Sequence, residues 1–181
     1  ALVIMDQRLE SKHPMRLRVV NSLGNTYFQA GKFEDAELRF AEAAHLREQS
    51  LGFAHLETIL SLFNLAETRF ELDRVRDAKD LYTRIVESDE SSLPEEHWAR
   101  GDAKIGLGKC LEKLGEIEDG ERNMIEGMRR VLLSLGASHP KYIAARESVG
   151  EFYDRQGRTE AAGLIRECKT IEGLSSFLTS E

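Results

Sequence analysis

Four histidines recur at a fixed step, and a set of imidazoles is the kind of group that can hold a metal ion. The step is 42 residues in a chain of 181 residues with five histidines in all: His13, His55, His97 and His139. Zinc needs each imidazole nitrogen about 2.0–2.1 Å away. Equivalent residues of successive two-helix units lie about 10 Å apart or more, because packed helices are separated by about 8–10 Å. The spacing therefore predicts no metal site, and we expect each histidine to begin a helix and fill the junction between units.

No arrangement of residues in the sequence is typical of catalysis. The chain has no G-x-S-x-G motif, no glycine-rich phosphate loop and no H-E-x-x-H motif. Cys110 and Cys168 are not at a paired or metal-ligand spacing, so we expect reduced thiols packed as small hydrophobic residues. We therefore expect no enzymatic activity, no metal and no cofactor.

The charge balance excludes two classes of partner. A net charge of −7 argues against nucleic acid, whose phosphates require a basic face, and against an anionic membrane surface. The apolar run at residues 1–5 is far shorter than the roughly 20 residues that span a bilayer. Together with reduced cysteines, these features predict a cytoplasmic protein.

Small residues follow the same 42-residue step, which predicts a stack of two-helix units. In the first unit Val20, Leu23 and Tyr27 recur at helical spacing, and Gly31 stands where a helix C-cap is expected. This unit is interpreted as helix A at about 14–30 and helix B at about 33–50. Helices that cross closely need small residues at the crossing, and two columns supply them: Gly24, Ala66, Gly108 and Gly150 in helix A, with Ala36, Ala78, Gly120 and Ala162 in helix B. The predicted fold class is all-α, an α-solenoid.

These columns resemble the tetratricopeptide repeat. Helix A meets the family pattern with Leu23, Gly24 and Tyr27, and helix B with Ala36, Phe40 and Ala43. The 42-residue spacing and the His-Pro pairs at 13–14 and 139–140 are similar to the kinesin-light-chain subclass. The resemblance implies a right-handed superhelix of helix-turn-helix repeats with helix A along a concave face. The third unit departs from the pattern, because Lys104 replaces an apolar residue and Gly120 and Gly127 replace alanines.

The histidine step divides the chain into a single domain of repeats at 13–54, 55–96, 97–138 and 139–171. Residues 1–12 align with 43–54 one period later, so we expect the end of a truncated repeat and a fragment of a larger protein. Leu174, Phe177 and Leu178 allow residues 172–181 to fold back as a cap, with a frayed tail as the alternative.

The candidate binding residues are those of helix A that the core does not use. They combine amides that suit a peptide backbone, apolar anchors and charges: Arg18, Asn21, Asn25, Phe28, Leu60, Phe63, Asn64, Glu67, Lys109 and Lys113. In the alternative, the asparagines only cap contacts between repeats and the protein's own segments fill the apolar positions. Lys109 and Lys113 resemble part of the carboxylate clamp of chaperone-binding members, but the first unit lacks the matching lysine.

The predicted function is non-catalytic binding of a protein or peptide segment, as a scaffold or adaptor. The groove favours a ligand with apolar anchors and some basic charge. One alternative is the regulatory region of a larger signalling enzyme such as a bacterial Ser/Thr kinase. Another is self-association through the open N-terminal repeat end. The acidic run at 87–96 is expected to be a solvated loop, with a docking patch for a basic partner as the alternative.

Overall fold

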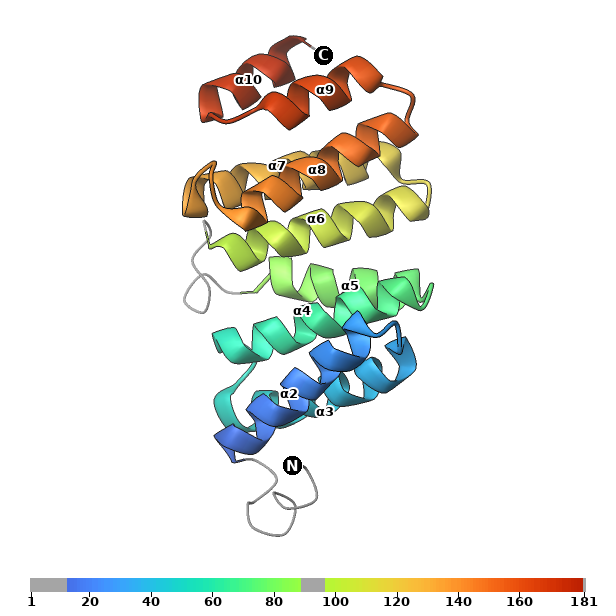
Figure 1. Ribbon diagram of the computed structural model, residues 1–181, viewed down its shortest axis with the longest axis vertical. Coiled ribbons are helices and arrows are strands. Elements are labelled where there is room, and N and C mark those ends of the chain that lie inside the picture. Colours follow the sequence, from blue (N-terminus) through green and yellow to red (C-terminus); the bar gives the residue numbers. More distant parts are fainter. Residues whose placement is uncertain (1–12, 89–96, 181) are drawn as a thin grey trace. The chain divides into compact units, whose positions relative to one another are not determined.

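The computed structural model describes residues 13–88 and 97–180, with side chains up to residue 175. The expectations for residues 1–12, most of the acidic run, Phe177 and Leu178 lie outside the described residues and side chains. Every element within these ranges is an α-helix, which confirms the all-α prediction (Figure 1). None of these helices is long and apolar enough to cross a membrane. The chain divides into two units, residues 1–93 and residues 94–181.

The first unit contains α2 (Pro14–Gln29), α3 (Phe33–Leu51), α4 (Leu56–Glu71) and α5 (Val75–Val86). Each helix packs on the next one in the chain, as the blue to green ribbons of Figure 1 show. The core between α2, α3 and α4 includes Phe40, Ala36 and Leu65, all at most 5% exposed. The apolar residues at helical spacing thus lie on the faces that the neighbouring helices cover.

The second unit contains α6 (Trp98–Lys113), α7 (Ile117–Leu135), α8 (Pro140–Arg155), α9 (Thr159–Glu167) and α10 (Ile171–Ser180). Its core gathers large side chains from α8 with residues of α7, α9 and α10, including Tyr142, Phe152, Tyr153 and Ile165. The tyrosines bury their hydroxyls only with a partner: Tyr153 donates to Glu121 at 2.7 Å. Burial raises the pKa of this tyrosine, and the neighbouring Glu121 carboxylate adds to the shift.

The last helix pair differs from the others because its second helix is broken. The helix α7 has 19 residues, whereas α9 has 9 and is followed by a separate α10. The Tyr142 hydroxyl and the Arg146 guanidinium both donate to the carbonyl of Cys168 at 3.1 Å, where α9 ends. The chain then turns so that α10 packs on α7 and α9, with Leu174 only 1% exposed.

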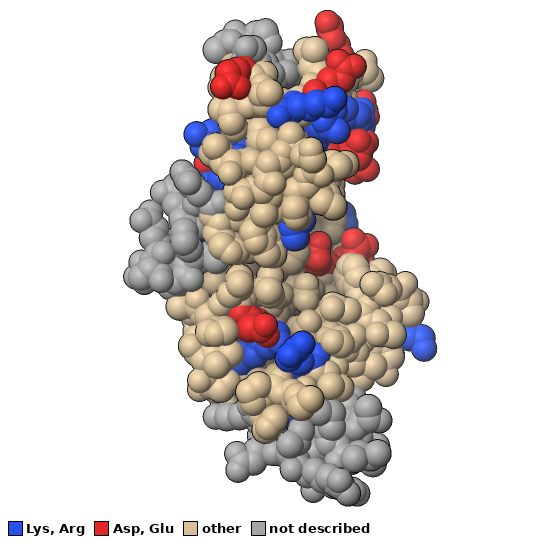
Figure 2. All heavy atoms as spheres, turned by 60° about the vertical axis from the view of Figure 1, so that its left-hand side comes forward, with Lys and Arg blue, Asp and Glu red and all other residues tan. Residues whose placement is uncertain are grey.

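Charged side chains pair across neighbouring helices in both units. Glu37 on α3 accepts from Arg69 at 3.0 Å and from Arg74 at 2.7 Å. Arg158 lies 3.0 Å from Glu121. Figure 2 shows acidic and basic side chains next to one another on the face in view, rather than an extended patch of one sign.

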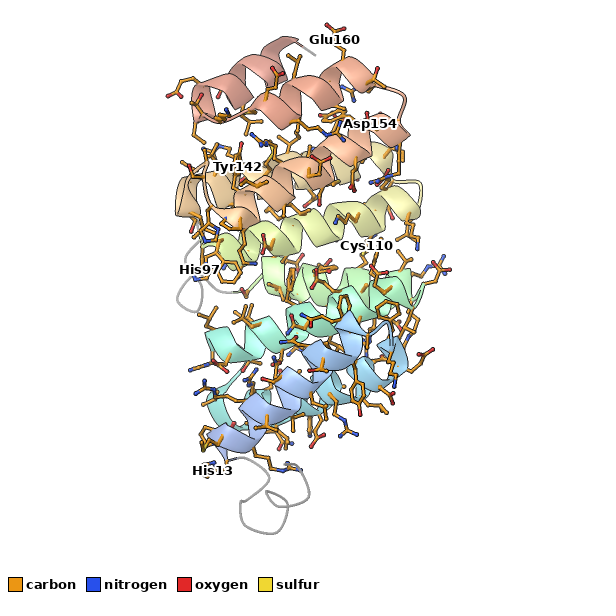
Figure 3. All side chains as sticks on the ribbon, viewed as in Figure 1. His13, His97, Cys110, Tyr142, Asp154 and Glu160 are labelled. Atoms are coloured by element: carbon orange, nitrogen blue, oxygen red, sulfur yellow. The ribbon has the colours of Figure 1, made fainter. Side chains whose placement is uncertain are left out.

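Each histidine of the 42-residue ladder begins a helix. The four imidazoles are the N-caps of α2, α4, α6 and α8, and each Nδ1 accepts a hydrogen bond from the backbone two residues ahead. Figure 3 shows His13 and His97 at the starts of their helices. Among the described residues, no group of three or more His, Cys, Asp or Glu side chains could hold a metal ion. The histidines of the ladder therefore cap the N-termini of these four helices.

Turns within the helix pairs require left-handed backbone. Gly31, Gly115 and Gly157 have φ of 70°, 84° and 74°. In the second pair the same position is Asp73, with φ of 60°. Aspartate enters this region more readily than most residues because its short side chain bonds locally, which explains why the glycine column tolerates it.

The small-residue columns lie where helices approach most closely. A Cβ on Gly24 would meet the Phe40 ring at 2.7 Å. Between α6 and α7 the contact involves backbone, since a Cβ on Gly127 would lie 2.6 Å from the Gly101 carbonyl oxygen. The glycines by which the third repeat departs from the family pattern therefore let α6 and α7 pack backbone against backbone.

Replacing Gly127 by alanine should destabilise the protein by about 1–3 kcal/mol, because the added methyl meets backbone that cannot move aside. Gly163→Ala is the matched control, since a Cβ there meets nothing within 4 Å. It should leave stability unchanged or raise it by up to about 1 kcal/mol through helix propensity. Urea unfolding followed by circular dichroism compares the two, and equal effects would show that the close contact is unimportant.

Candidate binding surface

The first unit carries eight of the ten predicted binding residues, on α2 and α4. Arg18, Asn25 and Glu67 are exposed, whereas Asn21, Phe28, Leu60, Phe63 and Asn64 are half-buried. We call this surface the helix-A face of unit 1. Some of these side chains already contact or bond to other residues of the protein, and others do not.

Two apolar members pack within their own repeats. Phe28 contacts Phe33 edge to face, with ring centroids 5.3 Å apart. Phe63 contacts Tyr82 of α5 in the same way at 5.7 Å. Such pairs are worth about 0.5–1.5 kcal/mol beyond area burial, so both rings serve the fold and offer a ligand only their remaining exposed edges.

Asn21 belongs to a polar junction between the first two helix pairs. Arg47 of α3 is only 5% exposed. Its Nη1 donates to Ser61 Oγ at 2.5 Å, to the Glu57 carbonyl oxygen at 3.1 Å and to Asn21 Oδ1 at 3.4 Å. Its Nη2 lies 2.5 Å from the Glu57 carboxylate. Burial lowers the pKa of Arg47, and Glu57 opposes that shift. Asn21 therefore supports a contact between repeats, as the alternative interpretation of the asparagines held.

The sequence interpretation missed Arg47 and Ser61, although a signal for the arginine was present. Phe40, Ala43 and Ala44 are core residues of α3, and Arg47 continues their face at helical spacing. A charged residue in that register is expected to be buried and paired. The serine carries no such signal, because its role depends on the position of Arg47.

The equivalent junction in the second unit is apolar. Two periods after Asn21, Arg47 and Ser61 stand Ile105, Val131 and Ala145, which are 6%, 0% and 4% exposed within one hydrophobic cluster. The same position in the repeat is thus filled by a hydrogen-bonded arginine in unit 1 and by packed aliphatic side chains in unit 2.

Three members of the helix-A face remain available. The amides of Asn25 and Asn64 and the guanidinium of Arg18 have no hydrogen-bond or ion-pair partner among the residues that the structure describes. Leu60 lies on the same helix as Asn64, four residues before it. These side chains offer paired donors and acceptors, one positive charge and an apolar contact.

In the second unit, the acidic residues of α6 and α8 pair with arginines of the same unit. Glu112 accepts two hydrogen bonds from Arg155, at 2.9 and 2.8 Å. Arg166 donates to Glu147 at 2.9 Å and to Asp154 at 2.7 Å, and Figure 3 labels Asp154 near the end of α8. The predicted Lys109 is half-buried and Lys113 is exposed on α6. The Glu112, Glu147 and Asp154 carboxylates are thus already paired with arginines of the same unit.

A further polar pair joins α6 to α8. Lys141 Nζ lies 2.6 Å from Asp102 and 4.2 Å from the Trp98 ring centroid. Burial raises the pKa of the Asp102 carboxyl, and the hydrogen bond from Lys141 opposes the shift. The pair was not predicted, because the two residues are distant in sequence and only the packing of α6 on α8 brings them together.

The comparisons with known proteins agree with this architecture. Residues 20–91 match the family model for the tetratricopeptide repeat. This segment is similar to the tetratricopeptide repeat family. The resemblance predicted from the repeat columns is therefore confirmed. No curated protein matches the chain by sequence.

Solved structures extend the likeness to the whole chain. The nearly identical TPR-like repeats of a Podosopora anserina protein named as a kinesin light chain, in a variant form, give a TM-score of 0.72 at 19% identity, covering 99% of this chain and 82% of that one. BtubC (BKLC) from P. vanneervenii gives 0.71 at 14% identity, covering 96% and 68%. MamA gives 0.55 at 18%, covering 98% and 84%. At these identities the likeness shows the fold, an α-solenoid.

Removing Arg47 alone should cost more than replacing the whole polar junction. Arg47→Leu removes the donor to Ser61, to Asn21 and to the Glu57 carbonyl oxygen and leaves the Glu57 carboxylate without its ion pair. Only the bonds of Ser61 to Asn21 and to the Glu57 carbonyl oxygen remain, so the expected cost is about 2 kcal/mol. The triple variant Asn21→Ile, Arg47→Val, Ser61→Ala introduces the aliphatic set of unit 2 and should recover most of that loss, because neighbouring substitutions are not additive. Urea unfolding measures both, and a triple variant less stable than Arg47→Leu would contradict this account of the junction.

Proposed function

We propose that the protein is a non-catalytic module that binds an extended protein segment along the helix-A face of unit 1. Tetratricopeptide repeats generally mediate protein–protein interaction. The observation that carries the proposal is a pair of amides, Asn25 on α2 and Asn64 on α4, that bond to none of the residues the structure describes. Each amide can donate to a backbone carbonyl and accept from a backbone N–H, without reading the ligand's side chains.

An apolar anchor and a charge lie on the same face. Leu60 is half-buried and Arg18 is exposed and unpaired within the described ranges. Phe28 and Phe63 add only the ring edges that Phe33 and Tyr82 leave open. A scaffold or adaptor role follows from such a face, since it holds a segment and has no group placed to transform it.

Unit 2 is the weaker candidate for the same task. Its Glu112, Glu147 and Asp154 carboxylates are bonded to Arg155 and Arg166. A ligand would have to break these pairs before it could use either partner, and charge-assisted hydrogen bonds are worth about 1.5–3 kcal/mol. We therefore place the ligand on unit 1 and propose that backbone and apolar contacts dominate its recognition, with basic charge in the ligand secondary.

The two cysteines support a compartment for this function. Cys110 and Cys168 are buried thiols, as expected where cysteines stay reduced. We propose that the module acts in the cytoplasm.

Loss of both amides should weaken ligand binding without lowering stability. Random peptides displayed on phage are selected on the wild-type chain, and the enriched peptide is made in fluorescent form. Asn25→Ala with Asn64→Ala should weaken its binding by about 10- to 100-fold in fluorescence anisotropy, since each amide contributes about 1 kcal/mol or more. The unfolding midpoint should stay unchanged or rise slightly, because neither amide bonds to a described residue and alanine is the better helix former.

Asn123→Ala is the matched control, because it removes the same side chain from α7, where the amide bonds only to the Asp119 carbonyl of its own helix. It should bind the peptide like the wild type. Failure of the wild-type chain to enrich any peptide, or equal affinity of the double variant, would reject the proposed function.

A further inference from the structure

The four ladder histidines cap their helices through the same atom. The backbone N–H groups of Met15, Glu57 and Ala99 donate to the Nδ1 atoms of His13, His55 and His97 at 3.2 Å. The Lys141 N–H donates to His139 Nδ1 at 3.1 Å. An imidazole accepts at Nδ1 only when that atom is unprotonated, which means the neutral ring with its proton on Nε2. Each of the four caps therefore requires its histidine to be neutral, with the proton on Nε2.

We propose that this ladder makes the protein a pH-sensitive fold, whose four helix caps hold at neutral pH and are each lost when the imidazole takes up a proton. Histidine titrates near pH 6.5 in an unstructured chain, so the transition lies at mildly acidic pH. This inference is independent of the proposed peptide binding, because it concerns the free protein.

Two effects penalise the protonated ring in the folded chain. A proton on Nδ1 replaces an acceptor by a donor that faces another donor, so the cap is lost. The ring's positive charge also lies at the positive end of the helix macrodipole. Folding therefore favours neutral imidazole, and the unfolded chain binds more protons as the pH falls. Stability is then complete above the unfolded pKa and decreases as the pH falls below it.

The size of the expected change in stability follows from the contribution of one N-cap to the free energy of unfolding. Loss of one cap changes the folding equilibrium constant by about fivefold. Four independent caps would change it by roughly several hundredfold, which is a large part of the stability of a small domain. A single capping histidine would not give this sensitivity, whereas the fixed step of 42 residues repeats it at every helix pair.

The charged groups around the ladder modulate the four sites unequally. His97 packs on Trp98, with ring centroids 5.3 Å apart, and burial lowers its pKa, in the direction expected for a neutral cap. The Asp102 carboxyl acts electrostatically on His139 and is itself bonded to Lys141. Near His55, the Glu57 carboxylate is held by Arg47. His13 is exposed. Because burial adds to the penalty on the protonated ring at His97, His97 should contribute most.

Protonation of Asp102 also affects stability, and its effect is opposite to that of the histidines. Burial raises the pKa of its carboxyl, so the folded chain holds that proton more tightly than the unfolded chain does. This contribution to stability increases as the pH falls. The experiment therefore includes Asp102→Asn, which removes it.

The test is urea unfolding of the full chain, followed by circular dichroism, between about pH 8 and about pH 5. The wild type should lose stability across this range, with two to four protons taken up on unfolding. Asparagine is a good N-cap with no titration, so the variant with His13, His55, His97 and His139 all changed to Asn should lose most of this proton uptake. Asp102→Asn should make the wild-type dependence steeper.

His45→Asn is the matched control, because His45 lies on α3 outside the ladder and bonds to Gln49 at 2.9 Å. It should keep the wild-type pH dependence. Should the fourfold variant not fold, His97→Asn alone must reduce the proton uptake by close to one. A fourfold or single variant with wild-type pH dependence would overturn the proposal, and so would imidazole nitrogen spectra showing Nδ1–H at the four positions at neutral pH.

Discussion

Helix A and helix B of each pair approach through positions that hold a hydrogen atom or a methyl group in place of a large side chain. Gly24 lies under the Phe40 ring, and Gly127 lies against the Gly101 backbone. Packed interiors leave little room for even one extra methylene group, so these positions set the separation of the helices. The separation in turn decides which side chains of helix A the core uses and which remain on the helix-A face.

The junctions between successive pairs are less constrained, and the two units fill them differently. In unit 1 a buried Arg47 needs Asn21, Ser61 and Glu57 as partners, whereas in unit 2 Ile105, Val131 and Ala145 pack without hydrogen bonds. A buried guanidinium tolerates few neighbours, because each donor must be satisfied. The polar junction occupies the Asn21 amide, whereas the amides of Asn25 and Asn64 bond to none of the described residues.

The starts of the helices depend on hydrogen bonds to the backbone of the first turn. The backbone N–H groups of the first turn have no partner within the helix, and a histidine Nδ1 supplies one at each of α2, α4, α6 and α8. The ladder that suggested metal chemistry is thus explained by the needs of the backbone. The cap ties the conformation of four helix ends to an imidazole that accepts a hydrogen bond only while its Nδ1 is unprotonated.

Much of the fold could be predicted from the sequence, because the spacing of apolar and small residues depends directly on where helices lie and where they cross. The 42-residue step, the small-residue columns and the glycine turns predicted helix pairs with tetratricopeptide character, and the family match and the fold confirm this. The site was only partly readable. Spacing shows that Asn21, Asn25 and Asn64 lie on helix A, but not that Arg47 bonds to the first and leaves the other two free.

The same limit applies to the charges: Glu112 and Arg155 lie 43 residues apart, and only the packed helices bring them into contact. Local sequence determined where helices begin, end and cross, because those depend on backbone conformation and side-chain size. Tertiary structure decided which polar groups are already paired, because pairing depends on distances between residues that are remote in the chain.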